Sequence, residues 1–340
     1  MPVQTPHPSY SRYAPEWAKI RTFLAGARAV RAQGEAFLPK TKSWKQEEYD
    51  AYKARAEVYG AVDRTVDGLD GAIFRKAPRT DFKDPEKLSE DVTLSSKSLV
   101  VSLRGIVREI IPIGRQGVLV DHTGRDDGAG NPAKPAVDRP YIVIYAAEDI
   151  INWDTKVIGG ETKLTLVVLR EKVSIERPSH PLVKGNQFGY RAPRLVDGRY
   201  VVELWTEDTA AENTTVSVGT STPQEKIYKK TQEFIPTRRG EPLDEIPFFF
   251  IGPSGQDPEP EKPPLLDIVD LCVLHYMTSA DYAHGLHWVA LPTPYICGSN
   301  DKDKIGIGPT SAIVLDDPQA QVGMLEFEGA GLSAVKERLQ

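Results

Sequence analysis

Cysteine is nearly absent from this sequence, which has only Cys272 and Cys297 among its 340 residues. Two cysteines 25 positions apart exclude a disulfide framework and a CxxC metal site. Both lie in apolar runs, so we expect reduced, buried thiols. No stretch reaches the roughly 18 apolar residues of a membrane helix, and no basic segment followed by an apolar one opens the chain. The sequence therefore predicts a protein of the reducing cytoplasm, or of a particle assembled there.

Excess positive charge is also missing. The net charge is −6 with a pI near 5.7, so we do not expect a surface that grips phosphates throughout. Apolar residues make up 40% of the chain and charged residues 26%, which is ordinary for a folded protein. The length allows about two domains.

Recognisable catalytic motifs are absent as well. The sequence has no GxxxxGK[ST] phosphate loop and no GxSxG nucleophile elbow, and Gly124–Gly130 lacks the GxGxxG spacing. We therefore predict a protein that is not an enzyme and has no cofactor, metal site or catalytic residue. Two groups of residues could bind a metal ion, but a structural role is favoured for each. Asp121, Asp126, Asp127 and Asn131 could bind a cation in a loop, but a solvated turn is favoured. Asp281, His284 and His287 could bind a metal ion from one side of a helix, but histidines that are hydrogen-bonded in an interface are favoured.

The first third of the chain has helical patterns. Four prolines in residues 1–15 predict an extended arm, and apolar spacings of three and four predict helices over 16–36, 45–74 and 98–112. We expect a break in 45–74 near Gly60 or Gly68. The tyrosines of this helix could stack nucleic-acid bases, but their stripe continues into aliphatic residues, which favours core packing.

Strand patterns dominate the middle of the chain. We expect a mixed, mostly antiparallel β region, with Asp197-Gly198 at a hairpin turn and a flexible polar segment at 207–222. The predicted strands are 117–121, 141–145, 164–173, 190–195, 200–206, 227–235 and 247–251.

A proline-rich stretch, 252–264, then predicts a stiff linker. A long helix follows over 265–290, with three short strands at 294–297, 312–315 and 322–327, and a last helix begins at Leu332.

Several ordered motifs carry a resemblance to a known family. They are EYDAYKARA at 48–56 with RTVDGL at 64–69, GRQGVLVD at 114–121, YAAEDIINW at 145–153, and PLLDI at 264–268 followed by His275-Tyr276, Ser279–Tyr282 and Leu291–Pro294. In this order they resemble the portal proteins of tailed bacteriophages, most closely a portal-like family of formerly unknown function. The resemblance covers about residue 8 to the end.

The resemblance implies an α+β, portal-like architecture, whose parts can be assigned to ranges of this sequence. An N-terminal arm would span 1–15 and a wing 16–252, with helices in 16–112 and a β region in 113–252. A linker at 253–263 would lead to a stem helix at 264–290, a small β clip at 291–328 and the start of a return stem helix at 329–340. The crown of portal proteins has no counterpart here, so we expect this chain to represent wing, one stem helix and clip.

A portal subunit is a structural protein of the virion. The resemblance implies a homo-oligomeric ring, of about twelve copies, at the unique capsid vertex, through which double-stranded DNA is packaged and ejected. Expected partners are the terminase large subunit, the head–tail adaptor, the major capsid and scaffold proteins, and DNA held by non-specific contact. Assembly would take place in the bacterial cytoplasm, with no membrane involved.

Candidate residues follow from that reading. Basic residues near the stem and clip would touch DNA phosphates without reading sequence, whereas paired charges of this kind are otherwise ordinary exposed faces. The DNA-channel candidates are Lys302, Lys304, Lys336 and Arg338. The clip-interface candidates are Tyr295, Ile296, Ile313, Leu315, Leu325 and Phe327.

Two other classes of function stay open at this point. One is a different phage structural protein, such as a head-completion or tail component. The other is a hydrolase or transferase whose acids lie in the β region, although no paired catalytic motif supports it.

Overall fold

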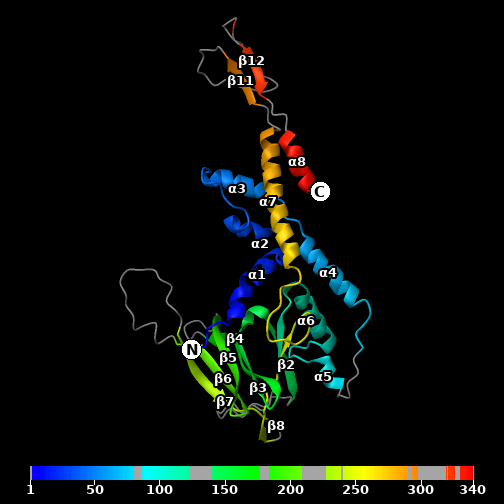
Figure 1. Cartoon of the computed structure of the whole chain (residues 1–340), viewed down its shortest axis with the longest axis vertical. Helices are drawn as coiled ribbons and strands as arrows, with labels where there is room; N and C mark the ends of the chain where they lie inside the picture. The colour runs from blue at the N-terminus through cyan, green and yellow to red at the C-terminus, as the bar shows by residue number, and fades with distance from the viewer. Residues whose placement is uncertain are drawn as a thin grey trace, which may run out of the picture. The chain divides into compact units, whose positions relative to one another are not determined.

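The fold is given by a computed structural model, shown in Figure 1. It describes residues 2–79, 86–122, 139–176, 184–208, 227–238, 240–289, 293–297, 319, 321–325 and 330–339. The chain divides into two compact units, one of residues 1–24 and 62–269 and the other of residues 25–61 and 270–340. Among the described helices, none is long and apolar enough to cross a bilayer.

The first unit combines helices with two main antiparallel sheets. Its helices are α1 (Pro8–Leu24), α4 (Ala61–Ile73), α5 (Glu86–Glu90) and α6 (Leu99–Ile113). One sheet has the order β10-β1-β2 and the other is a five-stranded meander, β3-β4-β5-β6-β7. The strands are β1 (Gln116–His122), β2 (Pro140–Ala146), β3 (Ile150–Ile158), β4 (Glu161–Glu176), β5 (Lys184–Val196), β6 (Arg199–Glu207), β7 (Tyr228–Phe234), β8 (Thr237–Arg238), β9 (Glu241–Pro242) and β10 (Phe248–Ile251).

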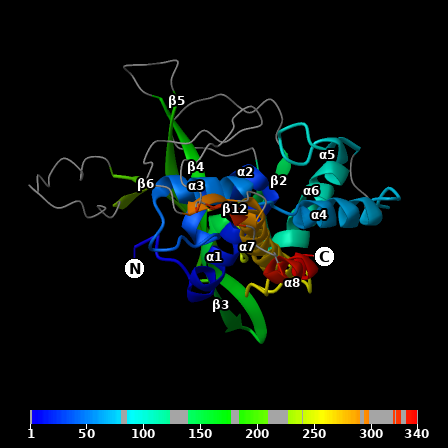
Figure 2. The same ribbon diagram turned by 90° about the horizontal axis from the view of Figure 1, so that it is seen from above.

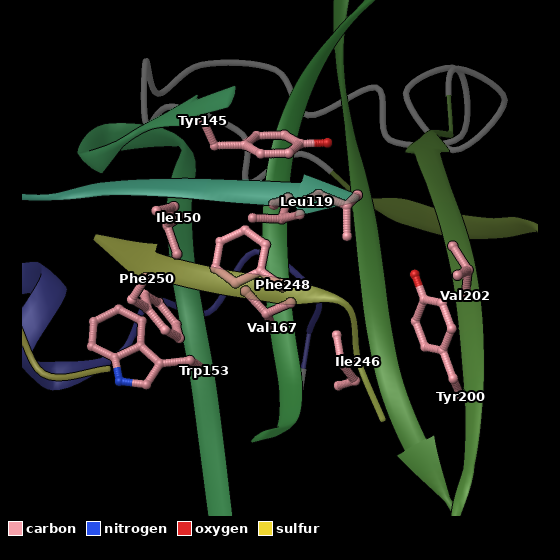
Figure 3. Packing of buried hydrophobic residues seen from close by; sticks show 11 residues of the cluster. Leu119, Tyr145, Ile150, Trp153, Val167, Tyr200, Val202, Ile246, Phe248 and Phe250 are labelled. Atoms are coloured by element: carbon pink, nitrogen blue, oxygen red, sulfur yellow. The ribbon is translucent and has the colours of Figure 1, made fainter. Parts of the chain in front are cut away.

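A hydrophobic core joins the two sheets. Strand β10 shows the alternation that creates it, because Phe248 and Phe250 are buried whereas Phe249 between them is exposed. Figure 3 shows Phe248 close to Val167 of β4, and Phe250 beside Trp153 of β3. Gly117 in β1 permits this packing, since an added Cβ would lie 2.2 Å from the ring of Phe248. These contacts make the β region one folded body of α+β class.

The extended arm predicted for residues 1–15 is wrong from Pro8 onward. Helix α1 begins at Pro8, where the missing N–H matters little, and it tolerates Pro15 in its interior. Pro15 has no N–H and so removes one backbone hydrogen bond of the helix, and the burial of Trp17, Ile20 and Phe23 offsets this loss. Residues 2–7 are not helical and lie along β3 of the same chain, where the His7 amide donates to the Ile151 carbonyl at 2.8 Å.

Two predicted helices are each divided. The one expected over 16–36 breaks at Gly26, whose φ of 87° lies in the left-handed region, and α2 (Ala27–Ala32) follows. The one expected over 45–74 becomes α3 (Gln46–Arg55) and α4, with Ala56 extended between them and Gly60 just before α4. Core packing of Tyr49 and Tyr52 is confirmed, since they are 3% and 5% exposed. The same packing is not seen for Tyr59, which falls in the break and is 53% exposed.

Helix α6 confirms the prediction for 98–112. The Ser98 side chain accepts from the Val101 amide at its start, and Gly114 closes it with a φ of 76°. Figure 2 shows α4 and α6 side by side. Asp70 of α4 is 2% exposed and accepts hydrogen bonds from Arg104 and Arg108 of α6. The Arg104 hydrogen bond lowers the pKa of the Asp70 carboxyl, so this link between the helices weakens as the solution is acidified.

All seven predicted strands of the middle region are confirmed, and every described pairing among them is antiparallel. The Asp197-Gly198 turn joins β5 to β6 with positive φ at both residues, as a two-residue hairpin requires. Strand β3 was not predicted. Residues 123–138, which include Asp126, Asp127 and Asn131, and most of the polar segment at 207–222 lie outside the described residues.

Candidate functional site

Helix α7 (Leu266–Val289) is the longest described helix, and from Asp270 onward it belongs to the second unit. Its 24 residues give a length of about 36 Å at 1.5 Å per residue. The prediction of a long helix over 265–290 is therefore confirmed. The chain bends immediately before it, where the Leu266 amide donates to the Pro263 carbonyl at 3.1 Å, and prolines at 263 and 264 prevent an earlier start.

Helix α7 is apolar around most of its circumference. Cys272, Tyr276 and Ala280 are almost fully buried in the second unit, as one apolar stripe of a packed helix should be. Two leucines on another side are not covered within this chain, because Leu271 is 65% exposed and Leu274 is 43% exposed. They lie three residues apart and so share a face. Such a helix buries its second apolar side only against a partner.

The segment after α3 is fixed to α7 by hydrogen bonds. The Ser279 hydroxyl accepts from the Glu57 amide at 3.0 Å, and it also lies 3.0 Å from the Glu57 carbonyl. The Tyr52 hydroxyl donates to Oδ1 of Asp281 at 2.5 Å. Burial and the adjacent Asp281 carboxylate raise the pKa of the Tyr52 phenol, so Tyr52 stays protonated and remains the donor.

A pocket of about 400 Å³ lies beside these contacts, within the second unit. Three rings border it, with Trp44 4.9 Å from Tyr52 and 5.3 Å from His284 between ring centroids. Burial, together with Arg55 nearby, lowers the pKa of His284, so the imidazole is neutral at pH 7. The pocket is lined by Leu38, Pro39, Thr41, Trp44, Tyr52, Met277, Asp281, His284 and Gly285.

The metal hypothesis for Asp281, His284 and His287 finds no support in this geometry. Asp281 is hydrogen-bonded to Tyr52, and the His284 ring packs against the rings of Trp44 and Tyr52. In the described ranges, no three side chains of His, Cys, Asp or Glu gather as metal ligands would.

A hairpin follows α7 in the chain. Strands β11 (Thr293–Cys297) and β12 (Gln321–Leu325) pair antiparallel, as predicted for the first and third short strands, while the second at 312–315 lies outside the described residues. Tyr295 faces Gly323 across the pair, and its ring lies over this glycine. A Cβ added to Gly323 would be 2.6 Å from the Tyr295 ring. Cys297 is exposed, so the prediction that both thiols are buried is wrong for it, because it is the last residue of a strand in a two-stranded hairpin, which has no core of its own.

The hairpin exposes apolar side chains. An isolated two-stranded hairpin is only marginally stable in water, so we expect these side chains to pack against a partner. Val322 and Met324 point to one face and are 50% and 56% exposed. Of the predicted interface residues, Tyr295 and Leu325 are 48% and 50% exposed and Ile296 is half-buried. Ile313, Leu315 and Phe327 lie outside the described residues.

Helix α8 (Ala330–Leu339) lies beside α7, as Figure 1 shows. The two helices approach closely at Gly285, where an added Cβ would be 2.5 Å from Cδ2 of Leu332. Of the predicted DNA-contacting residues, Lys336 is exposed on α8. Lys302, Lys304 and the side chain of Arg338 lie outside the described part of the chain.

Substituting Gly285 by valine should loosen α8. The new Cβ collides with Leu332, and overpacking of this kind costs roughly 1–3 kcal/mol. We expect faster amide hydrogen exchange over residues 333–339. Adding Leu332→Ala should restore much of the protection, because it removes the colliding atoms; no rescue would show that the two residues are not in contact.

A comparison with known families matches this same part of the chain. A family described as a domain of unknown function (DUF4055) matches residues 264–340, which contain α7, the hairpin and α8. No curated protein matches the chain. The similarity to the family thus covers 77 of the 340 residues.

Sequence reasoning did not single out Trp44, Gly285 or Gly323. The two glycines act through close contacts between elements distant in sequence, and no local pattern announces such contacts. Tyr52 and Asp281 were both identified, but their pairing across 229 positions was not foreseeable from spacing.

Proposed function

We propose that this chain is a portal subunit of a tailed bacteriophage. The observation that carries the proposal is the order of a long helix α7, the β11–β12 hairpin and α8, which is the order of stem helix, clip and return helix that the resemblance implies. The motifs of the first half, which resemble portal proteins, support it independently. The family match is compatible with it, since it covers the same elements.

Exposed apolar residues explain why the chain would form a ring. Leu271 and Leu274 on α7, with Val322 and Met324 on the hairpin, are uncovered in a single copy. Identical neighbours around a rotation axis offer each copy the same complementary surface, so a closed ring buries all of these residues at once. The number of copies in such a ring would be about twelve.

The proposed ring acts by geometry and not by catalysis. It would occupy one vertex of the capsid, hold open a conduit for double-stranded DNA, and dock the terminase large subunit and later the head–tail adaptor. Lys336 on α8 offers a sequence-independent, salt-dependent contact for DNA phosphates. The capsid and scaffold proteins would surround the ring during assembly in the host.

Deletion of the clip tests this function directly. We expect a chain lacking residues 295–327, rejoined by a short Gly/Ser linker, to form the β-sheet unit normally, because that unit contains none of these residues. The terminase large subunit should no longer be retained by the deleted protein in a pull-down, whereas the intact protein should retain it. Equal retention by both proteins would contradict the clip assignment.

A further inference from the structure

Arg115 is a charged residue in the interior of the first unit, between α6 and β1. It is 2% exposed, and its guanidinium carbon lies 4.2 Å from the ring centre of Trp153 and 4.6 Å from that of Phe250. Burial lowers the pKa of Arg115 to about 10, while Glu259 and Asp257 oppose the shift. The guanidinium is therefore charged at neutral pH, and its buried N–H groups require acceptors.

Only part of that requirement is met within the described chain. Nη1 donates to the Pro258 carbonyl at 2.6 Å. Nε and Nη2 are buried and have no hydrogen-bond partner among the described residues. Leaving a charged donor unpaired in the interior is costly, so we expect an acceptor other than the described residues to meet these two nitrogens.

A small cavity adjoins Arg115. Its volume is about 10 Å³, close to the space that one water molecule occupies. The walls come from the end of α6, the end of β10 and the linker that precedes α7. They are formed by Gly114, Arg115, Ile251, Gly252, Gly255, Asp257, Glu259, Pro260 and Glu261.

We propose that this cavity is a binding site for one ordered water molecule, which bridges Arg115 to the acidic linker. Water is the occupant that the surroundings select. An anion would be repelled by Asp257, Glu259 and Glu261, a cation would be repelled by Arg115, and an apolar group would leave the guanidinium N–H groups unpaired. Water accepts from the guanidinium and donates to a carboxylate or carbonyl oxygen.

The bridged guanidinium fixes the linker onto the β core. Glu259 is already held there, because it accepts hydrogen bonds from Nε1 of Trp153 at 3.3 Å and from the Ser9 hydroxyl at 2.7 Å. Arg115 adds a direct hydrogen bond to the Pro258 carbonyl and, through the proposed water, a second link to the linker. The course of residues 252–263 toward the start of α7 is thus set by Arg115 together with the hydrogen bonds of Glu259. This inference concerns the first unit alone and holds whether or not the chain forms a ring.

A structure of the unaltered protein at better than about 2 Å resolution tests the water site. We expect a single peak within hydrogen-bonding distance of Nε or Nη2 of Arg115, with a second polar contact to the linker. An empty cavity, an anion, or a carboxylate bound directly to these nitrogens would overturn the proposal.

Hydrogen exchange tests the attachment of the linker. In Arg115→Met we expect amides over 252–265 to exchange at least tenfold faster while those of β4 and β5 keep their protection. Arg12→Met is the matched control, since Arg12 also lies over a ring, that of Tyr13, but is exposed. If Arg115→Met does not fold, Arg115→Lys retains the charge and should show the same local acceleration. Unchanged exchange over 252–265 in a folded variant would refute the role of Arg115.

Discussion

Replacing Leu271 and Leu274 together by aspartate should leave this protein monomeric. Both side chains are exposed on α7 in a single copy, so the proposed ring is what buries them. Burial of a leucine contributes about 1.5–3 kcal/mol, and a carboxylate in the same place adds a desolvation penalty of several kcal/mol. Each subunit contact would lose the contribution of two leucines. Sedimentation velocity should show the wild-type ring replaced by single chains.

The exposure of these leucines also provides the controls. Because neither is part of the core of its own chain, the aspartate variant should keep the wild-type circular dichroism spectrum. Leu271→Met with Leu274→Met retains the apolar surface and should still assemble. A ring formed equally well by the aspartate variant would exclude this face of α7 from the interface.

Trp153→Ala should be among the most destabilising single substitutions in the β-sheet unit. Trp153 is 3% exposed and lies in the core cluster between the two sheets (Figure 3). Removing a buried tryptophan costs roughly 3–5 kcal/mol. The change also deprives Arg115 of one of its two ring contacts and Glu259 of a hydrogen bond. Urea denaturation followed by circular dichroism should show the loss as an earlier midpoint for this unit.

Trp205→Ala is the matched control for that experiment. Trp205 lies on β6, is only half-buried and packs at the margin of the smaller cluster formed by Ile151, Val168 and Ala192. It should lose less than half as much stability as Trp153→Ala, because less apolar area returns to water. Equal losses would mean that the region between the sheets is not the main source of stability.

Local patterns were sufficient for elements whose signal is short-range. The Asp197-Gly198 turn depends on two adjacent residues and forms as expected. The helix predicted over 98–112 and the strand predicted over 247–251 likewise depend on short apolar runs, and both form. Helix α7 was predicted nearly to the residue, because its apolar period is uninterrupted and prolines flank it.

Elements decided by tertiary packing were predicted less well. Proline statistics excluded a helix at residues 8–15, but burial of Trp17 and Ile20 outweighs the hydrogen bond lost at Pro15. The break expected near Gly60 in the helix over 45–74 is confirmed, but it begins four residues earlier, at Ala56, which is extended. Strand β3 begins with a buried run and ends exposed, so no simple alternation marks it.

In the candidate site, too, features with a local sequence signal were predicted and features that depend on distant contacts were not. Sequence identified the helix and the two strands of the hairpin, since apolar residues in short strands are a local signal; Tyr295 and Leu325 are exposed there, and their role in an interface stays a prediction. It did not identify Gly285, whose importance comes from Leu332 lying 47 positions later in the chain. Arg115 was equally invisible, because a lone arginine between a helix and a strand gives no sign that it is buried.

We propose that copies of this chain close into a ring, and an image of the purified particle along its symmetry axis tests this proposal most directly. We predict a closed ring with a central opening, built from about twelve chains of 37.6 kDa. Isolated monomers or dimers of the intact protein, at concentrations where portal rings would be assembled, would contradict the account.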